Sequence, residues 1–287
     1  MDRKRPARPS RPSRPAPEGS ERGTRRRGPE TPAAPREPIG RDRAPSAPSP
    51  RRQAAPRGPA APERPDLPSD HRVTLPAFVR KEVERRVSPK GRARDVLTCL
   101  DLGSAASEQG EHGEALRLLR WAKHLAPRLA LVREALGIAM YRAEEYRAAL
   151  TELQAYRRLG GSTDQNHLVA DCLRATGAPA EEAVTVGLEL VEDARAEPDR
   201  RLEAAIVVAA ALEEGGQRRR ARTVLAGTAA TAERAEDEAR ARRHWFAAEL
   251  AERDGDTGGA VAELDALLRL GPDDDAAAWR ERLSRGA

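Results

Sequence analysis

The stretch GEHGEALRLLRWAKHLAP, residues 110–127, recurs twice along the chain, and the offset is a constant 34 residues when its Ala115 is aligned with Ala149 and Ala183. These later copies are AEEYRAALTELQAYRRLG at 143–160 and GAPAEEAVTVGLELVEDA at 177–194. Two more copies follow at offsets of 38 and 39 residues, GGQRRRARTVLAGTA at 215–229 and DGDTGGAVAELDALLRLGP at 254–272. Self-similarity at such a period predicts a repeat architecture, in which each unit buries its apolar faces against its neighbours.

One small side chain holds the same place in all five copies, at Ala115, Ala149, Ala183, Ala221 and Ala260. This pattern resembles the tetratricopeptide repeat, a 34-residue pair of antiparallel helices in which small residues let the helices approach and large residues fill the space between them. The resemblance implies an all-α fold, a right-handed solenoid of about five helical hairpins with capping helices at its ends and a disordered tail before it.

Other signature positions of the repeat are present in several copies. Leu102, Gly103 and Pro127 match in the first, Leu136 and Gly137 in the second, and Pro272 in the fifth. The third and fourth copies match less closely, because Asp171 and Gly187 in the third and Thr228 in the fourth replace the usual residue types. A generic helical array is the alternative. The chain also resembles a group of tetratricopeptide-repeat proteins from high-GC bacteria that carry an Arg/Pro-rich tail, and this resemblance implies no particular activity.

Composition divides the chain before the repeats begin. Of 23 prolines, 17 fall in the first 70 residues, where Met1, Ile39 and Leu67 are the only large apolar side chains. Such a segment cannot bury enough surface to offset its chain entropy, which predicts disorder. The expected organisation is a basic tail, a basic capping helix with the start of the first repeat helix, five repeats and a C-terminal capping helix: 1–70, 71–95, 96–274 (as 96–129, 130–163, 164–197, 202–235 and 241–274) and 275–287.

The two capping helices are predicted from their start signals. Thr74 and Pro76 are expected to begin a short helix whose Leu75, Val79, Val83 and Val87 share one face. At the other end, Asp273–Asp275 supply acidic residues for the start of a helix in AAAWRERLS.

Charge is distributed very unevenly, although the net charge is only +5. Residues 1–95 hold 25 Lys+Arg against 12 Asp+Glu, while residues 96–287 hold 26 against 34. A basic arm therefore precedes an acidic body. Only four of the 51 basic residues are lysine, which is also what GC-rich codons would give.

By resemblance to the family, five positions of each first helix point into a concave groove, and there the sequence has seven glutamates and three arginines. The residues expected to contact a partner are Leu100, Glu134, Ile138, Tyr141, Leu168, Glu203, Ile206, Glu213, Trp245, Glu249 and Glu252. Leu100 and Ser104 replace the Lys and Asn of the family's clamp for C-terminal carboxylates, so a chaperone-tail adaptor is not expected. An acidic, partly apolar groove suits a basic amphipathic helix or an Arg-rich segment; glutamates on a solvated helix face are the alternative.

These observations favour a non-enzymatic protein-interaction scaffold. The clusters SERGTRRRG (20–28) and SPRRQAAPRG (49–58) of the tail are candidates for docking on the groove in competition with a partner. The alternative function is non-specific contact of the tail with RNA or DNA phosphates. The sequence has no motif typical of nucleotide-binding, metalloprotease or hydrolase sites, and no cofactor or metal site is expected.

Cellular location is inferred from three features. The start MDRKRPARPS has no apolar core typical of a signal peptide, and no apolar run reaches the roughly 20 residues that span a bilayer. Cys99 and Cys172 are isolated, which favours inert core thiols over a disulfide or metal site. The expected location is the cytoplasm.

Overall fold

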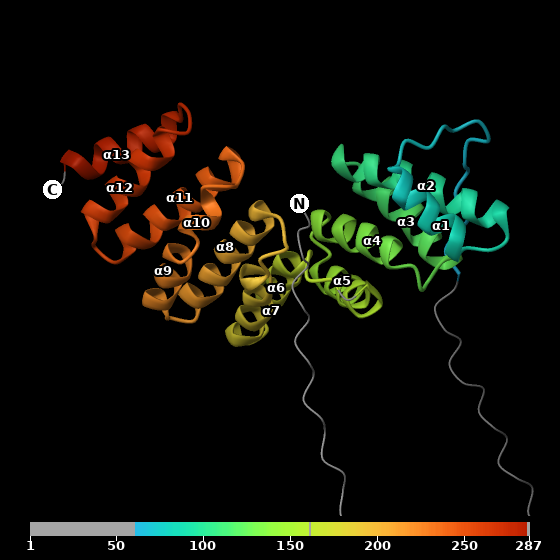
Figure 1. The fold of residues 1–287 in the computed structure, drawn as a ribbon, viewed down its shortest axis with the longest axis horizontal. Coiled ribbons are helices and arrows are strands. Elements are labelled where there is room, and N and C mark those ends of the chain that lie inside the picture. Colours follow the sequence, from blue (N-terminus) through green and yellow to red (C-terminus); the bar gives the residue numbers. More distant parts are fainter. Residues whose placement is uncertain (1–60, 161, 286–287) are drawn as a thin grey trace, which may run out of the picture. The chain divides into compact units, whose positions relative to one another are not determined.

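The computed structural model describes residues 61–160 and 162–285, and within these ranges every regular element is a helix. Five helical hairpins follow one another in sequence order (Figure 1). Their helices are α2 (Lys90–Glu108) with α3 (His112–Leu125), α4 (Ala130–Arg142) with α5 (Tyr146–Gly160), α6 (Asn166–Ala175) with α7 (Ala180–Glu192), α8 (Pro198–Glu214) with α9 (Arg218–Ala226), and α11 (Asp237–Arg253) with α12 (Thr257–Leu268). The predicted all-α hairpin solenoid is confirmed.

Helices outside the hairpins complete the fold. α1 (Ala77–Arg86) packs on α2, and α13 (Asp274–Arg285) packs on α12. The start of α13 follows the prediction, since Asp273 Oδ1 accepts a hydrogen bond from the backbone N–H of Ala276 at 2.8 Å. The additional short helix α10 (Ala229–Ala232) follows α9 and accounts for the longer spacing between the fourth and fifth copies.

The shared alanine of each copy lies in the centre of its hairpin. Ala115, Ala149, Ala183, Ala221 and Ala260 are each at most 1% exposed. The signature glycines mark the closest helix contacts: a Cβ placed on Gly137 would lie 2.8 Å from Leu153 Cγ, and one on Gly103 would lie 2.8 Å from Leu119 Cγ. A methyl group at either position would overlap a neighbouring leucine, which explains why glycine stands there.

The turn between the two helices of a hairpin has the same backbone conformation in all five hairpins. The second residue after the first helix has a positive φ, at Gly110, Gly177, Gly216 and Gly255 with values between 74° and 77°, and at Glu144 with 58°. Glycine adopts this left-handed region without a steric cost, whereas a side chain such as that of Glu144 does not. The repeat is thus present in the turns as well as in the helix contacts.

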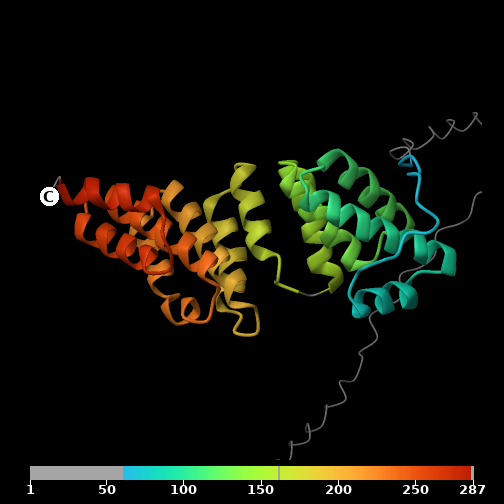
Figure 2. The same cartoon turned by 90° about the horizontal axis from the view of Figure 1, so that it is seen from above.

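Residues 61–76 are not helical and run beside α1 and α2 (Figure 2). Leu67, Val73 and Leu75 pack against the core, so this end strap (residues 61–76) closes the first end of the stack. Residues 61–70 were expected in the disordered tail, and this is wrong because Leu67 packs on the core. Thr74 was expected to begin a helix, and this is also wrong. Thr74 instead donates hydrogen bonds to Asp101 of α2, and α1 begins after Pro76 with no side-chain cap. The rest of the predicted tail, 1–60, lies outside the described residues.

The apolar core of the described residues forms three clusters. The first extends along the hairpins from Val83 to Leu250, and the second lies in α11, α12 and α13. A small third cluster joins Leu202 to Ala232 and Ala239. Helix α11 belongs to both large clusters, with Leu250 in the first and Ala248 and Ala251 in the second.

Candidate functional site

The first helices of the hairpins, α2, α4, α6, α8 and α11, contact one another in succession. Ile138, Tyr141, Leu168, Ile206 and Trp245 lie on the last four of these helices, and all five side chains are half-buried. We refer to these five side chains together with Glu134, Glu203, Glu213, Glu249 and Glu252 as the first-helix face. These are the residues that the sequence predicted to contact a partner, with one exception.

The exception is Leu100, which is only 3% exposed and belongs to the main core cluster. Its helix α2 is enclosed by α1, α3 and α4, and the end strap adds apolar contacts at the same end of the stack. Leu100 therefore stabilises the fold and is not available to a partner, which corrects the prediction for this residue.

Every predicted carboxylate of the first-helix face accepts a hydrogen bond from within the chain. Glu134 accepts one from Gln165 Nε2 of the loop before α6 at 2.8 Å. Glu203 on α8 accepts one from Arg242 Nε of α11, also at 2.8 Å. Both contacts join successive hairpins, so these glutamates hold the stack together as well as lining its surface.

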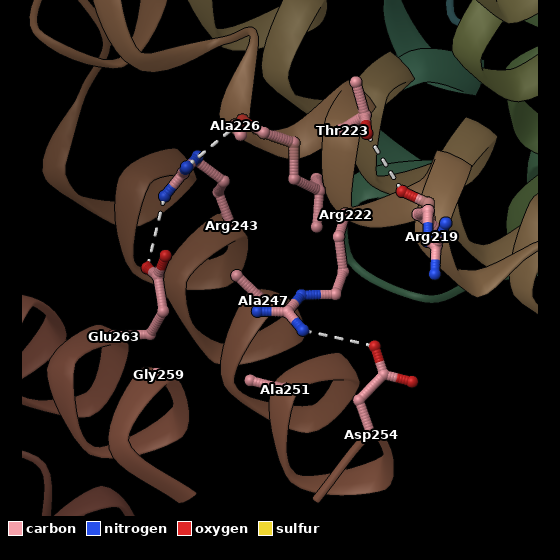
Figure 3. Close-up of a pocket in the computed structure, with 11 residues that line it drawn as sticks. Arg219, Arg222, Thr223, Ala226, Arg243, Ala247, Ala251, Asp254, Gly259 and Glu263 are labelled. Atoms are coloured by element: carbon pink, nitrogen blue, oxygen red, sulfur yellow. Dashed lines mark hydrogen bonds and ion pairs between the residues drawn. The ribbon is translucent and has the colours of Figure 1, made fainter. Parts of the chain in front are cut away.

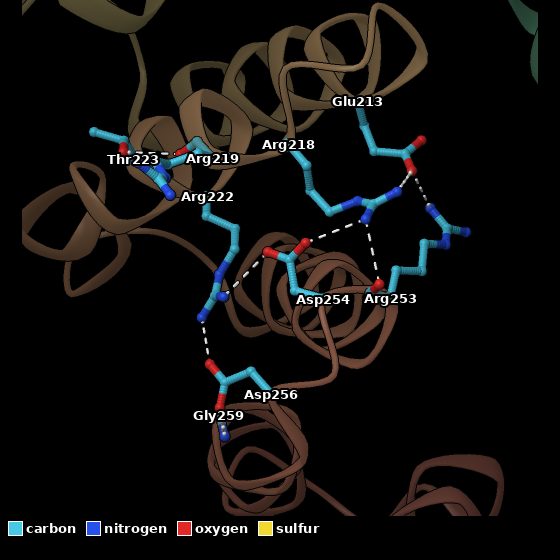
Figure 4. A network of polar contacts seen from close by, with 9 residues as sticks. All are labelled: Glu213, Arg218, Arg219, Arg222, Thr223, Arg253, Asp254, Asp256 and Gly259. Atoms are coloured by element: carbon cyan, nitrogen blue, oxygen red, sulfur yellow. Dashed lines mark hydrogen bonds and ion pairs between the residues drawn. The ribbon is translucent and has the colours of Figure 1, made fainter.

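Glu213 lies in a polar network between the fourth and fifth hairpins (Figure 4). Its Oε1 is 3.2 Å from Arg218 Nη2 and 3.6 Å from Arg253 Nη1. Arg218 also reaches Asp254 at 3.2 Å, and Arg222 reaches both Asp254 at 3.2 Å and Asp256 at 2.5 Å. The turns at the ends of α8 and α11 are thereby tied by alternating charges.

Glu249 and Glu252 accept hydrogen bonds from two tryptophans. Trp245 Nε1 donates to Glu249 at 3.0 Å and Trp279 Nε1 donates to Glu252 at 2.8 Å, while the two indole rings lie 5.2 Å apart between centroids. Arg282 of α13 donates to Glu252 at 2.9 Å, and this hydrogen bond is the main cause that holds the pKa of Glu252 below its ordinary value. The C-terminal end of the first-helix face therefore consists of a pair of tryptophans and two glutamates whose carboxylates already accept hydrogen bonds.

Tyr141 and Asp171 form a further contact between hairpins on this face. The Tyr141 hydroxyl donates to Asp171 Oδ2 at 2.6 Å. Burial, strengthened by this hydrogen bond, raises the pKa of Tyr141 well above its ordinary value. Asp171 also accepts from Arg174 Nε at 2.9 Å, and Arg174 reaches Glu214 at 2.6 Å. The unusual Asp171 of the third copy is therefore explained: it anchors Tyr141 and Arg174.

Reasoning from repeat positions missed several of the arginine donors. Arg218 and Arg222 lie on α9, the second helix of the fourth hairpin, and Arg282 belongs to α13. None of the three occupies a position that the repeat assigns to the groove. The cluster of arginines in GGQRRRAR, directly after a hairpin turn, was the available signal, because a turn lies close to the equivalent turn of the next hairpin.

A cavity with a volume of about 700 Å³ lies between α9 and the α11–α12 hairpin (Figure 3). Arg243 lines it and is 6% exposed. Its guanidinium donates to Leu225 O at 3.1 Å, to Thr228 Oγ1 at 3.3 Å and to Glu263 at 3.3 Å. Glu263 is also 2.6 Å from His244 Nδ1. These contacts satisfy Arg243 internally, which indicates a structural role.

The described part of the chain contains no metal-ligand cluster, reactive thiol or membrane-spanning helix. Residues 61–160 and 162–285 contain no group of three or more His, Cys, Asp or Glu residues arranged to hold a metal ion. Cys99 and Cys172 are free and buried, and burial raises the pKa of each thiol to about 12. Both are core thiols, as predicted. None of the described helices is long and apolar enough to cross a membrane.

Comparison with solved structures identifies the same architecture elsewhere. The structure of pilF of Pseudomonas aeruginosa aligns with a TM-score of 0.55 at 17% identity, over 68% of this chain and 85% of that protein. TTC0263, a thermophilic TPR protein of Thermus thermophilus, aligns with a TM-score of 0.50 at 19% identity, over 66% of this chain and 98% of that protein. No protein-family model and no curated protein sequence matches the chain.

Proposed function

Starting from a tetratricopeptide-repeat fold, we propose that this protein is a non-enzymatic scaffold that binds a peptide or helix of a partner protein along its first-helix face. The observation that supports this most directly is the half-burial of Ile138, Leu168, Ile206 and Trp245. Side chains in this state still have apolar surface to lose. They stand on four consecutive first helices, so an extended or helical segment can contact several of them at once.

The carboxylates of the face specify the kind of partner. Glu203, Glu213, Glu249 and Glu252 remain 19–34% exposed although each already accepts hydrogen bonds. A carboxylate has about four acceptor sites, so each can take a further donor. A partner with Arg or Lys residues beside apolar anchors fits this surface. Because the glutamates are already paired, the expected attraction is weaker than the count of acidic residues suggests.

The chain's own tail is an internal competitor in this proposal. Residues 1–60 carry 16 Lys+Arg against 6 Asp+Glu and are tethered to the body, which gives them a high effective concentration near the face. Deletion of residues 1–60 should therefore tighten binding of a basic peptide. The deletion must stop at residue 60, because the end strap is part of the folded body.

The test is fluorescence anisotropy with a labelled peptide of residues 20–58. Its reference is the chain lacking residues 1–60. Glu203→Arg with Glu249→Arg should weaken binding by about tenfold or more. Glu203→Gln with Glu249→Gln, which keep hydrogen-bonding side chains, should have a smaller effect of the same sign. The matched control is Glu182→Arg with Glu192→Arg on α7, where both side chains are exposed and have no ion pair within the described residues.

Two results would argue against the proposal. If the α7 control weakens binding as much as the α8–α11 variant, the peptide is responding to net charge and not to the first-helix face. A gel shift of full-length and deleted chains with RNA and DNA at about 50 and 200 mM salt tests the alternative function. Tail-dependent binding that persists at the higher salt would favour a nucleic-acid partner.

A further inference from the structure

The connections before and after the first hairpin form a crevice near the first end of the stack. Residues 86–88 at the end of α1 make one side, residues 125–129 from the end of α3 to the start of α4 make the other, and the volume is about 370 Å³. Val87 and Leu129 are 8% and 4% exposed at its base, and the half-buried Leu125 adds apolar surface. We call this hollow the first loop crevice.

Three arginines line the first loop crevice, and no carboxylate does. Arg86 is paired with Glu82 of its own helix. Arg92 and Arg128 are exposed and form no ion pair with any described residue, in contrast to the compensated charges of the first-helix face. The first turn of α2, beside the crevice, contains no acidic side chain. The first loop crevice therefore has an apolar base and, at its rim, guanidinium groups that no carboxylate of the described residues neutralises.

This combination does not result from repeat geometry alone. The equivalent crevice before and after the third hairpin lies between the α5–α6 loop and the α7–α8 loop. It is lined by residues 162–164 and by Asp193, Arg195 and Ala196, and its volume is similar, about 310 Å³. There Asp193 accepts hydrogen bonds from Arg195 at 3.1 Å and from Thr163 at 3.2 Å. The hydrogen bonds from Arg195 lower the pKa of Asp193 to about 2. That crevice is polar and is lined by two carboxylates, Asp164 and Asp193, against the single guanidinium of Arg195, so the basic, apolar character belongs to the first one.

We propose that the first loop crevice binds an acidic segment of a partner protein, with an apolar side chain placed on Val87 and Leu129 and carboxylates bound by Arg92 and Arg128. Guanidinium groups bind carboxylates in a bidentate manner, and the volume of the crevice lies at the lower end of the range of ligand pockets. The chain's own tail does not fit, because its 16 basic residues against 6 acidic ones would be repelled. This site is separate from the first-helix face and selects the opposite charge.

The experiment uses the full-length chain and a fluorescein-labelled peptide with one leucine between two runs of three glutamates. Anisotropy titrations at about 200 mM salt suppress non-specific attraction to the tail. Arg92→Glu with Arg128→Glu should weaken binding by about tenfold or more, and Arg92→Gln with Arg128→Gln by a smaller factor. A peptide with serine in place of leucine should bind at least about threefold more weakly.

The control is Arg147→Glu with Arg158→Glu on α5, which changes the net charge equally at two exposed arginines without ion pairs in the described part. It should alter affinity by less than about twofold. An equal loss in this control, or equal binding of the serine peptide, would overturn the proposal. The proposal would also be overturned if the affinity for a 20-nucleotide DNA strand depended more strongly on Arg92 and Arg128 than the affinity for the peptide does. Self-association abolished by the same substitutions, seen by sedimentation, would instead assign the crevice to a second copy of the chain.

Discussion

Thr74 holds Asp101 through two hydrogen bonds, one from its backbone N–H at 2.8 Å and one from its hydroxyl at 2.7 Å. His71 Nε2 lies 2.8 Å from the same carboxylate, which is 9% exposed. Burial alone would raise the pKa of Asp101, but the hydrogen bonds from Thr74 and His71 outweigh it and hold that pKa below its ordinary value of 3.8. Asp101 is thus the anchor that fixes the end strap to α2.

Replacing this anchor should loosen the strap. We expect Asp101→Ala to lower the free energy of unfolding by about 2 kcal/mol at neutral pH, because Thr74 would lose a charged acceptor. Since the folded pKa is depressed, the contribution is complete above pH 3.8 and is lost as the pH falls from there through the folded value. Urea denaturation at pH 7 and pH 3 should therefore show a difference between wild type and variant that shrinks in acid.

Asp95→Ala is the control for this anchor. The ion pair of Asp95 with Arg64 is long, at 3.4 Å, and Arg64 is 68% exposed. Its loss should cost less than about 1 kcal/mol. Equal costs for the two substitutions would mean that Asp101 has no special role in holding the strap.

Glu144→Gly should stabilise the protein. Glu144 has a φ of 58°, whereas the equivalent residue of the four other hairpins is glycine. Relief of the left-handed strain should raise the free energy of unfolding by about 0.5–1 kcal/mol, after the entropy that glycine adds to the unfolded chain. Gly110→Ala, the reverse change in the first hairpin, should be destabilising. Thermal denaturation of both variants tests the pair, and a shift of the same sign in each would contradict the argument.

Arg243→Ala should be among the more damaging single substitutions. It removes one donor from Leu225 O, which keeps its hydrogen bonds from Thr228, and it leaves the Thr228 hydroxyl oxygen without the Arg243 donor. Glu263 keeps His244 as a partner. We expect a loss of about 3 kcal/mol, measured by chemical denaturation. Arg234→Ala, at an exposed arginine without an ion pair among the described residues, should cost less than about 0.5 kcal/mol. Similar losses would show that Arg243 is dispensable.

His167 should make stability depend on pH below neutrality. Burial, with a smaller effect of Arg200, lowers the pKa of His167 from 6.5 to about 4. Its Nδ1 is buried without a hydrogen-bond partner in the described structure. The unfolded chain therefore binds a proton below pH 6.5 that the folded chain does not, and stability falls by roughly 3 kcal/mol between pH 6.5 and 4 before levelling off.

The pH dependence should disappear when this imidazole is replaced. Urea denaturation of His167→Leu between pH 7 and 4 should show a flatter profile than wild type. The matched change His124→Leu, on an exposed side chain of α3, should keep the wild-type slope. An unchanged slope in His167→Leu would assign the dependence to other groups.

Much of the fold could be predicted because the repeat pattern records local packing. The position of each shared alanine is set by contact between two helices of the same hairpin, so Ala149 and Ala183 could be placed in the core from sequence alone. The end strap could not, because its composition resembles that of the tail. Its order depends on Asp101, which lies 27 residues after Thr74 in the chain.

For the candidate site, the sequence predicted which helices carry the apolar residues but not how the carboxylates are paired. Repeat positions assigned Ile138, Ile206 and Trp245 to first helices, and in the structure they are half-buried on α4, α8 and α11. The acidity expected from the glutamates was too high, since donors such as Arg218 and Arg282 come from helices that the positional argument did not consider. Leu100 was misplaced for a related reason, because enclosure at the end of a stack depends on segments outside the repeat.

The boundary between the two large core clusters runs along α11, where Arg243 of α11 and Arg218 and Arg222 of α9 add polar contacts to the apolar ones. In a repeat stack, stability is set by such interfaces between neighbours. The fifth hairpin and α13 should therefore open as one sub-global unit while the preceding hairpins stay folded, and their amide protons should exchange together. A partner that lies across Ile206 and Trp245 spans this boundary. Its binding should slow exchange in α12 and α13, two helices that it need not touch.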